Sequence, residues 1–101
     1  MHSPTITASK YWPGDLGIVA NYSAVYAKLM INGKSHGVHP FLVQLRDLNT
    51  HEPLKGRQMG DIGPKIGYNS KDNGYLILDQ VRIPRSNMLD RYASVDRQGN
   101  F

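Results

Sequence analysis

The sequence predicts an all-β fold, a small antiparallel β-barrel or sandwich. Ten glycines and six prolines recur between short apolar runs, and no segment keeps a helical spacing of apolar residues for three turns. Between residues 22 and 45 apolar and polar residues alternate, as they do in half-buried strands. The length of 101 residues suits one domain, so residues 1–101 are expected to form a single β domain.

The first strand is expected at residues 2–8, where three consecutive residues are β-branched. Residues 10–17 follow, with the only tryptophan beside a proline and a glycine, and are expected to form a turn. Pro13 fixes its own φ and is expected to hold Trp12 extended, while Gly14 leaves its backbone open to a ligand. From these residues alone, Trp12 is either a core residue beneath the turn or the wall of a site.

A β-hairpin is the clearest element of the sequence. Two alternating runs, residues 22–31 and 38–45, flank Asn32 and Gly33, and Asn-Gly is typical of a type I′ turn because both residues then need positive φ. The four residues after Gly33 are expected to lengthen the connection into a bulged or longer loop. Pro40 predicts that the second strand lies at an edge or contains a bulge.

The second half of the chain predicts two more strands around a long loop. The strands are expected at residues 57–61 and 74–83, and the loop at 61–74 is rich in Gly, Pro and Asn. Loops of this length inside small domains are usually functional. Asn73–Gly74 is expected to supply positive φ in a turn, and residues 85–101 to form a helical turn and a final short strand.

Composition excludes several classes of function. The chain has no cysteine, so disulfides and thiolate metal sites are excluded, and its formal net charge of +4 is spread without a basic run, which disfavours nucleic-acid binding. No apolar stretch is long enough for a membrane span. No metal site is expected either, since the histidines lack the spacing of a helical zinc pair: His2, His36, His39 and His51. No catalytic signature can be assembled from these residues alone.

Four separated strings, which occur in this order, carry a resemblance that covers essentially the whole chain: "HSPTITASKYWPGDLG", "HPFLVQLRD", "GDIGPKIGYNSKDNGYL" and "VRIPRSNML". They resemble the middle β-barrel domain of the peroxisomal acyl-CoA oxidases, within the acyl-CoA dehydrogenase superfamily. The resemblance implies an FAD-dependent enzyme that converts fatty acyl-CoA into trans-2-enoyl-CoA and reduces O2 to H2O2 in peroxisomal β-oxidation. It also implies a homodimer, and a catalytic glutamate in a helical domain outside this segment, so no catalytic residue is expected here.

The same resemblance assigns the cofactor-binding residues. Trp12, Pro13 and Gly14 match the Trp-Pro-Gly loop of the family, and Gly14 falls on the position whose backbone contacts FAD. Two alternatives remain. An acyl-CoA dehydrogenase would more usually carry Trp-Ile-Thr or Trp-Ile-Ser at this loop. A free-standing basic β module would bind nucleic acid or another protein, for example through the strand face that holds Tyr22, Tyr26 and Lys28.

Overall fold

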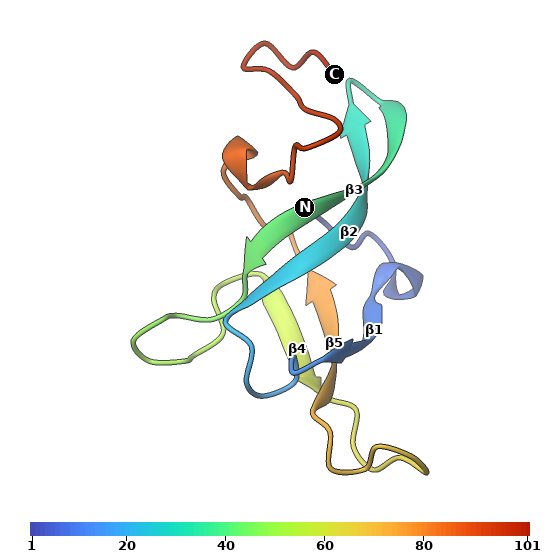
Figure 1. Ribbon diagram of the computed structural model, residues 1–101, viewed down its shortest axis with the longest axis vertical. Coiled ribbons are helices and arrows are strands. Elements are labelled where there is room, and N and C mark those ends of the chain that lie inside the picture. The colour runs from blue at the N-terminus through green and yellow to red at the C-terminus, as the bar shows by residue number, and fades with distance from the viewer. The chain divides into compact units, whose positions relative to one another are not determined.

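The computed structural model describes all of residues 1–101, and its regular structure is almost entirely β (Figure 1). The strands are β1 (Lys10–Gly14), β2 (Tyr22–Ile31), β3 (Lys34–Gln44), β4 (Arg57–Asp61) and β5 (Asn73–Leu78), and the 3-10 helices are η1 (Ile6–Ala8) and η2 (Arg85–Asn87). The prediction of an all-β, antiparallel fold is confirmed. No helix has both the length and the apolar character that a membrane crossing needs.

The chain divides into two compact units, each described by itself. The first comprises Met1–Ser23 with Gln44–Arg82, and the second comprises Ala24–Val43 with Ile83–Phe101. The first unit holds a three-stranded sheet in the order β1-β5-β4. The hairpin of β2 and β3 forms the other sheet, and most of it lies in the second unit.

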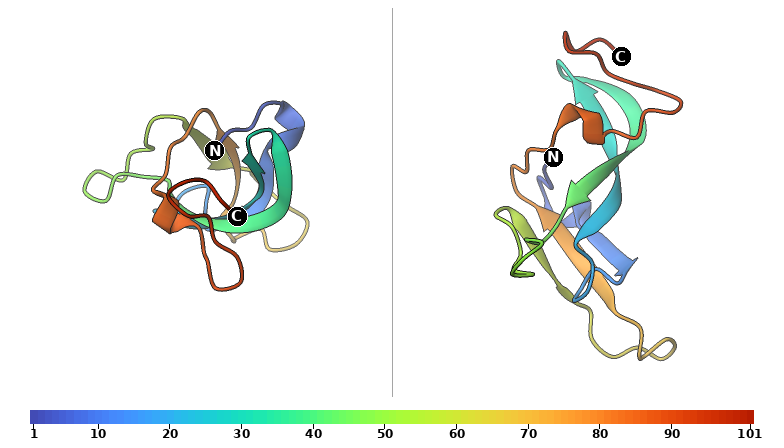
Figure 2. Two further views of the ribbon diagram at one scale, coloured as in Figure 1. Left: turned by 90° about the horizontal axis from the view of Figure 1, so that it is seen from above. Right: turned by 60° about the vertical axis from the view of Figure 1, so that its left-hand side comes forward.

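Strand β5 is the centre of the three-stranded sheet. It pairs antiparallel with β4 from Arg57↔Leu78 to Asp61↔Gly74, so the predicted strand at residues 57–61 is confirmed. The buried side chains of this unit include the following apolar residues: Leu16, Leu45, Leu76, Leu78 and Val81. The loop of residues 62–72 joins β4 to β5 and extends beyond the end of the sheet (Figures 1 and 2).

The hairpin of β2 and β3 confirms the Asn-Gly turn and corrects its length. Asn32 and Gly33 have φ of 49° and 78°, as a type I′ turn requires, and β3 begins directly at Lys34. The expected longer connection is therefore wrong, because the two turn residues already match the twist of the strands. Gly37, with φ of 85°, makes an irregularity within β3 instead. The buried apolar residues of the second unit are Val25, Val43 and Met88.

The strand predicted at residues 2–8 is wrong, and chain length explains why. The amide of Ser3 donates to the carbonyl of Leu78 (2.6 Å), while Lys10 pairs with Leu76. Seven residues of the N-terminal segment thus advance along only two residues of β5, which a continuous strand cannot do. The excess chain coils into the 3-10 helix Ile6–Ala8.

Three further predictions for the C-terminal half need correction. The strand predicted to reach residue 83 ends at Leu78, since Gln80 turns the chain with a φ of 51°. Asn73 and its following glycine begin β5 and have no positive φ, so the expected turn is wrong. The helical turn after residue 84 is confirmed at Arg85–Asn87, whereas the final strand is absent and Met88 makes a single bridge to Phe41.

Candidate functional site

The stretch expected to be a turn is a bulged edge strand. Along β1, Tyr11 pairs with Tyr75 and Gly14 pairs with Asn73, so three steps in β1 match two in β5 and one residue of β1 is extra. An edge strand tolerates Pro13 at such a bulge, because the missing N–H costs no ladder hydrogen bond there. We refer to residues 12–14 as the β1 bulge.

Trp12 departs from the extended conformation that Pro13 was expected to impose. Its φ is 81°, in the left-handed region that L-residues rarely adopt, because the extra residue of the bulge must reverse the local pleat. Its side chain is 50% exposed, so it is no core residue. The Nζ of Lys65 lies 6.0 Å from the centre of the indole ring, near the outer limit of a cation–π contact.

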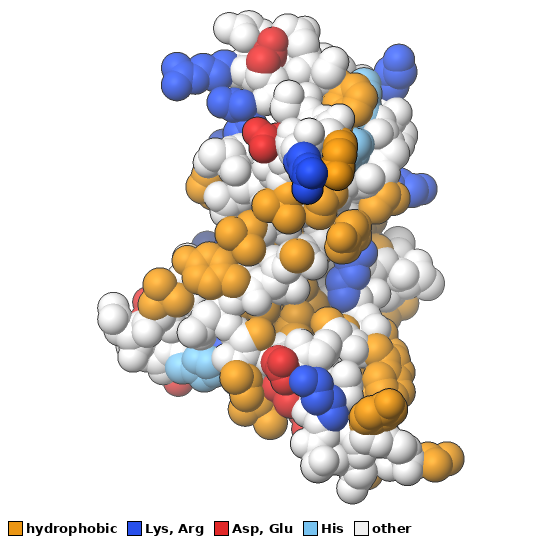
Figure 3. Space-filling model, in the orientation of Figure 1, with side chains coloured by type: hydrophobic (Ala, Val, Ile, Leu, Met, Phe, Trp, Pro, Cys, Tyr) orange, Lys and Arg blue, Asp and Glu red, His pale blue; other side chains and the backbone are white.

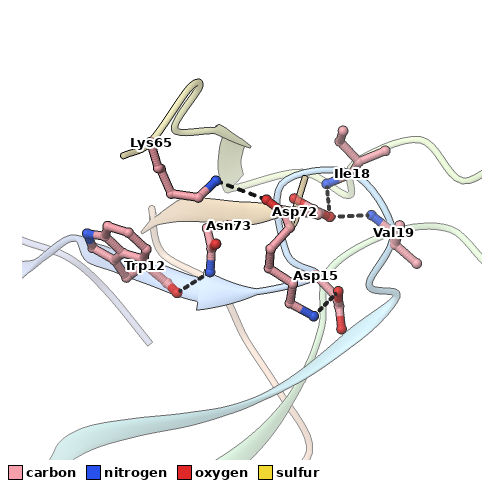
Figure 4. A network of polar contacts seen from close by, with 8 residues as sticks. Trp12, Asp15, Ile18, Val19, Lys65, Asp72 and Asn73 are labelled. Carbon is pink, nitrogen blue, oxygen red and sulfur yellow. Dashed lines mark hydrogen bonds and ion pairs between the residues drawn. The ribbon is translucent and has the colours of Figure 1, made fainter. Parts of the chain in front are cut away.

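Asn73, on the neighbouring strand β5, fixes the β1 bulge (Figure 4). Its side chain is only 8% exposed, and its Nδ2 donates to the carbonyl of Trp12 at 3.1 Å. Its Oδ1 is buried and accepts no hydrogen bond. The buried amide therefore has Trp12 as its hydrogen-bond partner, and sequence reasoning assigned it only to a turn.

Asp72 fixes the turn that follows the β1 bulge, also shown in Figure 4. Its backbone carbonyl accepts from the amide of Asp15 at 2.7 Å. Its Oδ2 accepts from the amides of Ile18 (2.9 Å) and Val19 (3.1 Å). A Cβ on Gly17 would lie 2.6 Å from Asp72 Oδ1, so the close approach requires a glycine. The adjacent residues Asp72 and Asn73 thus hold the chain on both sides of Gly14.

Arg46 holds the same turn through its carbonyls. Its side chain is buried, and Nη1 donates to the carbonyls of Leu16 (3.1 Å) and Ala20 (2.6 Å), while Nη2 donates to that of Gly17 (2.9 Å). Sequence reasoning missed this residue. The available signal in the sequence was that Arg46 directly follows the alternating apolar run at residues 38–45. It is a weak signal, because a charged side chain is rarely buried.

Gly14 presents an open side of the backbone at the β1 bulge. A Cβ built there would meet only the flexible side chain of Lys71, with Cε at 3.4 Å, and Gly14 has no positive φ. Lys71 in turn pairs with Asp15 at 2.7 Å, and Lys65 Nζ donates to the Lys71 carbonyl at 3.0 Å. A half-exposed indole, an open glycine and two cations meet here, and this set fits a planar cofactor with anionic groups, such as FAD.

The other candidate residues do not assemble into a site. The ring of His39 shares a hydrogen bond with the carbonyl of His36 (2.8 Å), and both rings contact Phe101, with ring centres 5.4 and 4.7 Å away. No group of three or more His, Cys, Asp or Glu is placed to hold a metal ion. Figure 3 shows hydrophobic side chains at the surface. Tyr22 and Tyr26 are both exposed, and they belong to different units of the chain.

Comparisons with known proteins agree in one family, although no family profile matches the chain. The chain is 55% identical over 104 residues to a putative peroxisomal acyl-coenzyme A oxidase 1.2 of Arabidopsis thaliana, covering 100% of the chain and 16% of that protein. Among solved structures, Arabidopsis thaliana acyl-CoA oxidase 1 matches with a TM-score of 0.95 and 55% identity, over 98% of this chain and 16% of that one.

A second solved structure is acyl-CoA oxidase-2 of Caenorhabditis elegans, described as bound with FAD, ascaroside-CoA and ATP. It matches with a TM-score of 0.95 and 52% identity, over 98% of this chain and 15% of that chain. The chain spans about 16% of the length of the curated relatives it matches. By sequence and by fold, the chain therefore corresponds to a β-rich segment of the peroxisomal acyl-CoA oxidases.

Proposed function

We propose that residues 1–101 form the middle β domain of a peroxisomal, FAD-dependent acyl-CoA oxidase. The enzyme converts fatty acyl-CoA into trans-2-enoyl-CoA with reduction of O2 to H2O2, and it works as a homodimer. Identity of 50–55% to peroxisomal acyl-CoA oxidases over the whole chain supports this assignment. The FAD and ascaroside-CoA described for the Caenorhabditis elegans oxidase support the cofactor and the CoA-ester substrate class.

The observation that carries the cofactor assignment is the β1 bulge. Trp12 presents a half-exposed ring, and Pro13 fixes its own backbone φ. The space beside the Gly14 backbone is open except for the end of the flexible Lys71 side chain. In the proposed enzyme these three residues contact FAD, with the backbone of Gly14 closest to it. When bound, FAD accepts two hydrogens from the acyl chain. The role of the chain is to orient the cofactor and to shield one side of it from water.

The test of this assignment is Gly14→Ala in the full-length enzyme. The new methyl group fits the folded chain, since its nearest neighbour is Lys71 Cε at 3.4 Å and Gly14 has no positive φ. Thermal stability of the FAD-free protein is therefore expected to stay within a few degrees of wild type. FAD affinity is expected to fall about tenfold or more, because the methyl group occupies the side from which the cofactor approaches.

A matched glycine in the same unit serves as the control. Gly67 also has open space around its Cβ position and no positive φ, so Gly67→Ala should leave FAD affinity unchanged and change stability by no more than about 1 kcal/mol. Full-length wild-type protein that binds no FAD would overturn the proposed function. Turnover with O2 as the sole acceptor, followed by H2O2 release, distinguishes an oxidase from an acyl-CoA dehydrogenase.

A further inference from the structure

Asn73 is a buried polar residue beside the β1 bulge, on the paired strand β5. It pairs with Gly14 in the β1–β5 register, it is 8% exposed, and its Nδ2 donates to the Trp12 carbonyl at 3.1 Å. It therefore contacts both ends of the segment to which the proposed function assigns FAD.

Stability alone does not explain an amide at this position. The Oδ1 of Asn73 is buried and accepts no hydrogen bond. A buried polar atom without a partner costs free energy, and an apolar residue of similar volume would avoid that cost. The amide is instead explained by its bond to Trp12, whose φ of 81° lies where a bulky residue needs a fixed partner to stay.

The turn after Gly14 is held independently of Asn73. Asp72 binds the amides of Ile18 and Val19, and Arg46 binds the carbonyls of Leu16, Gly17 and Ala20. Loss of the Asn73 side chain would therefore free the Trp12 peptide while the downstream turn stays in place. We therefore expect the effect of a substitution at Asn73 to be confined to the β1 bulge.

We propose that Asn73 is a positioning residue for FAD, which acts by fixing the Trp12 carbonyl and so the path of the backbone into Gly14. The inference rests on the proposed function, because it needs the β1 bulge to contact FAD. It gives Asn73 a role in cofactor geometry in addition to its place in the fold.

The test uses Asn73→Leu and Asn73→Asp in the full-length enzyme. Leucine has a similar size and lacks the donor, whereas aspartate places a carboxylate oxygen against the Trp12 carbonyl. FAD affinity is expected to fall about tenfold or more in both variants. The visible absorption band of the remaining bound flavin is expected to shift. For Asn73→Leu, the thermal midpoint of the FAD-free protein is expected to stay within a few degrees of wild type.

Matched controls are Asn49→Leu and Asn49→Asp, because Asn49 is exposed in a turn that contacts neither Trp12 nor Gly14. Both are expected to retain wild-type FAD affinity and flavin spectrum. Folded Asn73 variants with unchanged affinity and spectrum would overturn the inference while leaving the proposed function intact. Wild-type protein without FAD binding would overturn both. If neither Asn73 variant folds, Asn73→Ser is the test. The serine hydroxyl is a shorter donor than the asparagine amide, so we expect a loss of FAD affinity smaller than tenfold. Wild-type FAD affinity in this variant would overturn the inference.

Discussion

Lys71 Nζ lies 2.7 Å from Asp15 Oδ1, and this ion pair joins the long β4–β5 loop to the residue that follows the β1 bulge. Asp15 has a φ of 60°, which favours glycine. Two opposing effects therefore meet at this residue. The ion pair is about half exposed and stabilises by about 0–1 kcal/mol, while the left-handed backbone costs a non-glycine residue roughly 1 kcal/mol.

We expect Asp15→Gly to keep nearly the stability of wild type and Asp15→Ala to be less stable than either. Glycine loses the ion pair and relieves the backbone, so the free energy of unfolding should stay within about 0.5 kcal/mol of wild type. Alanine loses the ion pair and keeps the strained φ, so it should be less stable than glycine by about 1 kcal/mol. Urea unfolding measures the free energy of unfolding of both variants. An alanine variant as stable as the glycine variant would contradict the backbone argument.

Arg46 is expected to be indispensable for the turn at residues 15–20. Arg46→Ala leaves three carbonyls without their donors, so we expect a loss of about 3 kcal/mol or more in the free energy of unfolding. Arg46→Lys keeps the charge and loses the forked geometry, and should recover less than half of that loss. Denaturant unfolding of the three proteins tests the expected order of stability, in which wild type is most stable and Arg46→Ala least. Equal stability of Arg46→Lys and wild type would contradict it.

Asp47 is expected to titrate below its ordinary range. The backbone amide of Thr50 and then that of Asn49 donate to its carboxylate and lower its pKa from the ordinary value of 3.8. A depressed native pKa means that the bonds stabilise the fold above pH 4, and that this contribution is lost as the pH falls through the native pKa. The carboxyl carbon shift followed by NMR should show a midpoint below 3.8.

Asp47→Asn tests the same bonds through stability. The amide oxygen of asparagine still accepts hydrogen bonds and does not titrate, so the variant should lose less stability than wild type between pH 5 and about pH 3. Identical acid sensitivity in the two proteins would show that Asp47 makes no contribution to it.

Local chemistry in the sequence was sufficient to predict the hairpin. Asn32 and Gly33 encode a turn by their backbone preferences, and the alternation beside them encodes which face is buried, as Val25 and Val43 confirm. Both signals act within a few residues. The long loop between β4 and β5 was predicted for the same reason.

The geometry of the candidate site depends on pairing that sequence reasoning does not reveal. Pro13 and Gly14 ordinarily end regular structure, yet here they lie in an edge strand because β5, far away in the sequence, supplies partners such as Asn73 for Gly14. The bulge follows from register, and the hydrogen bond from Asn73 to Trp12 follows from the bulge. Resemblance directed attention to Gly14, whereas Arg46, Asp72 and Asn73 emerged only from the structure.

Gly74 and Gly17 are expected to be required for the close contact between β5 and the turn at residues 15–20. A Cβ on Gly74 would lie 2.5 Å from the Gly17 nitrogen and 2.8 Å from its Cα, and both are backbone atoms that cannot rotate away. Gly74→Ala must therefore displace the turn or β5, and we expect a loss of about 3 kcal/mol in the free energy of unfolding. Gly67→Ala, in open space on the adjoining loop, should change stability by no more than about 1 kcal/mol. Because the displaced turn directly follows Gly14, Gly74→Ala should also weaken FAD binding in the full-length enzyme. Wild-type stability of Gly74→Ala in urea would mean that the contact between Gly74 and Gly17 is looser than the structure shows.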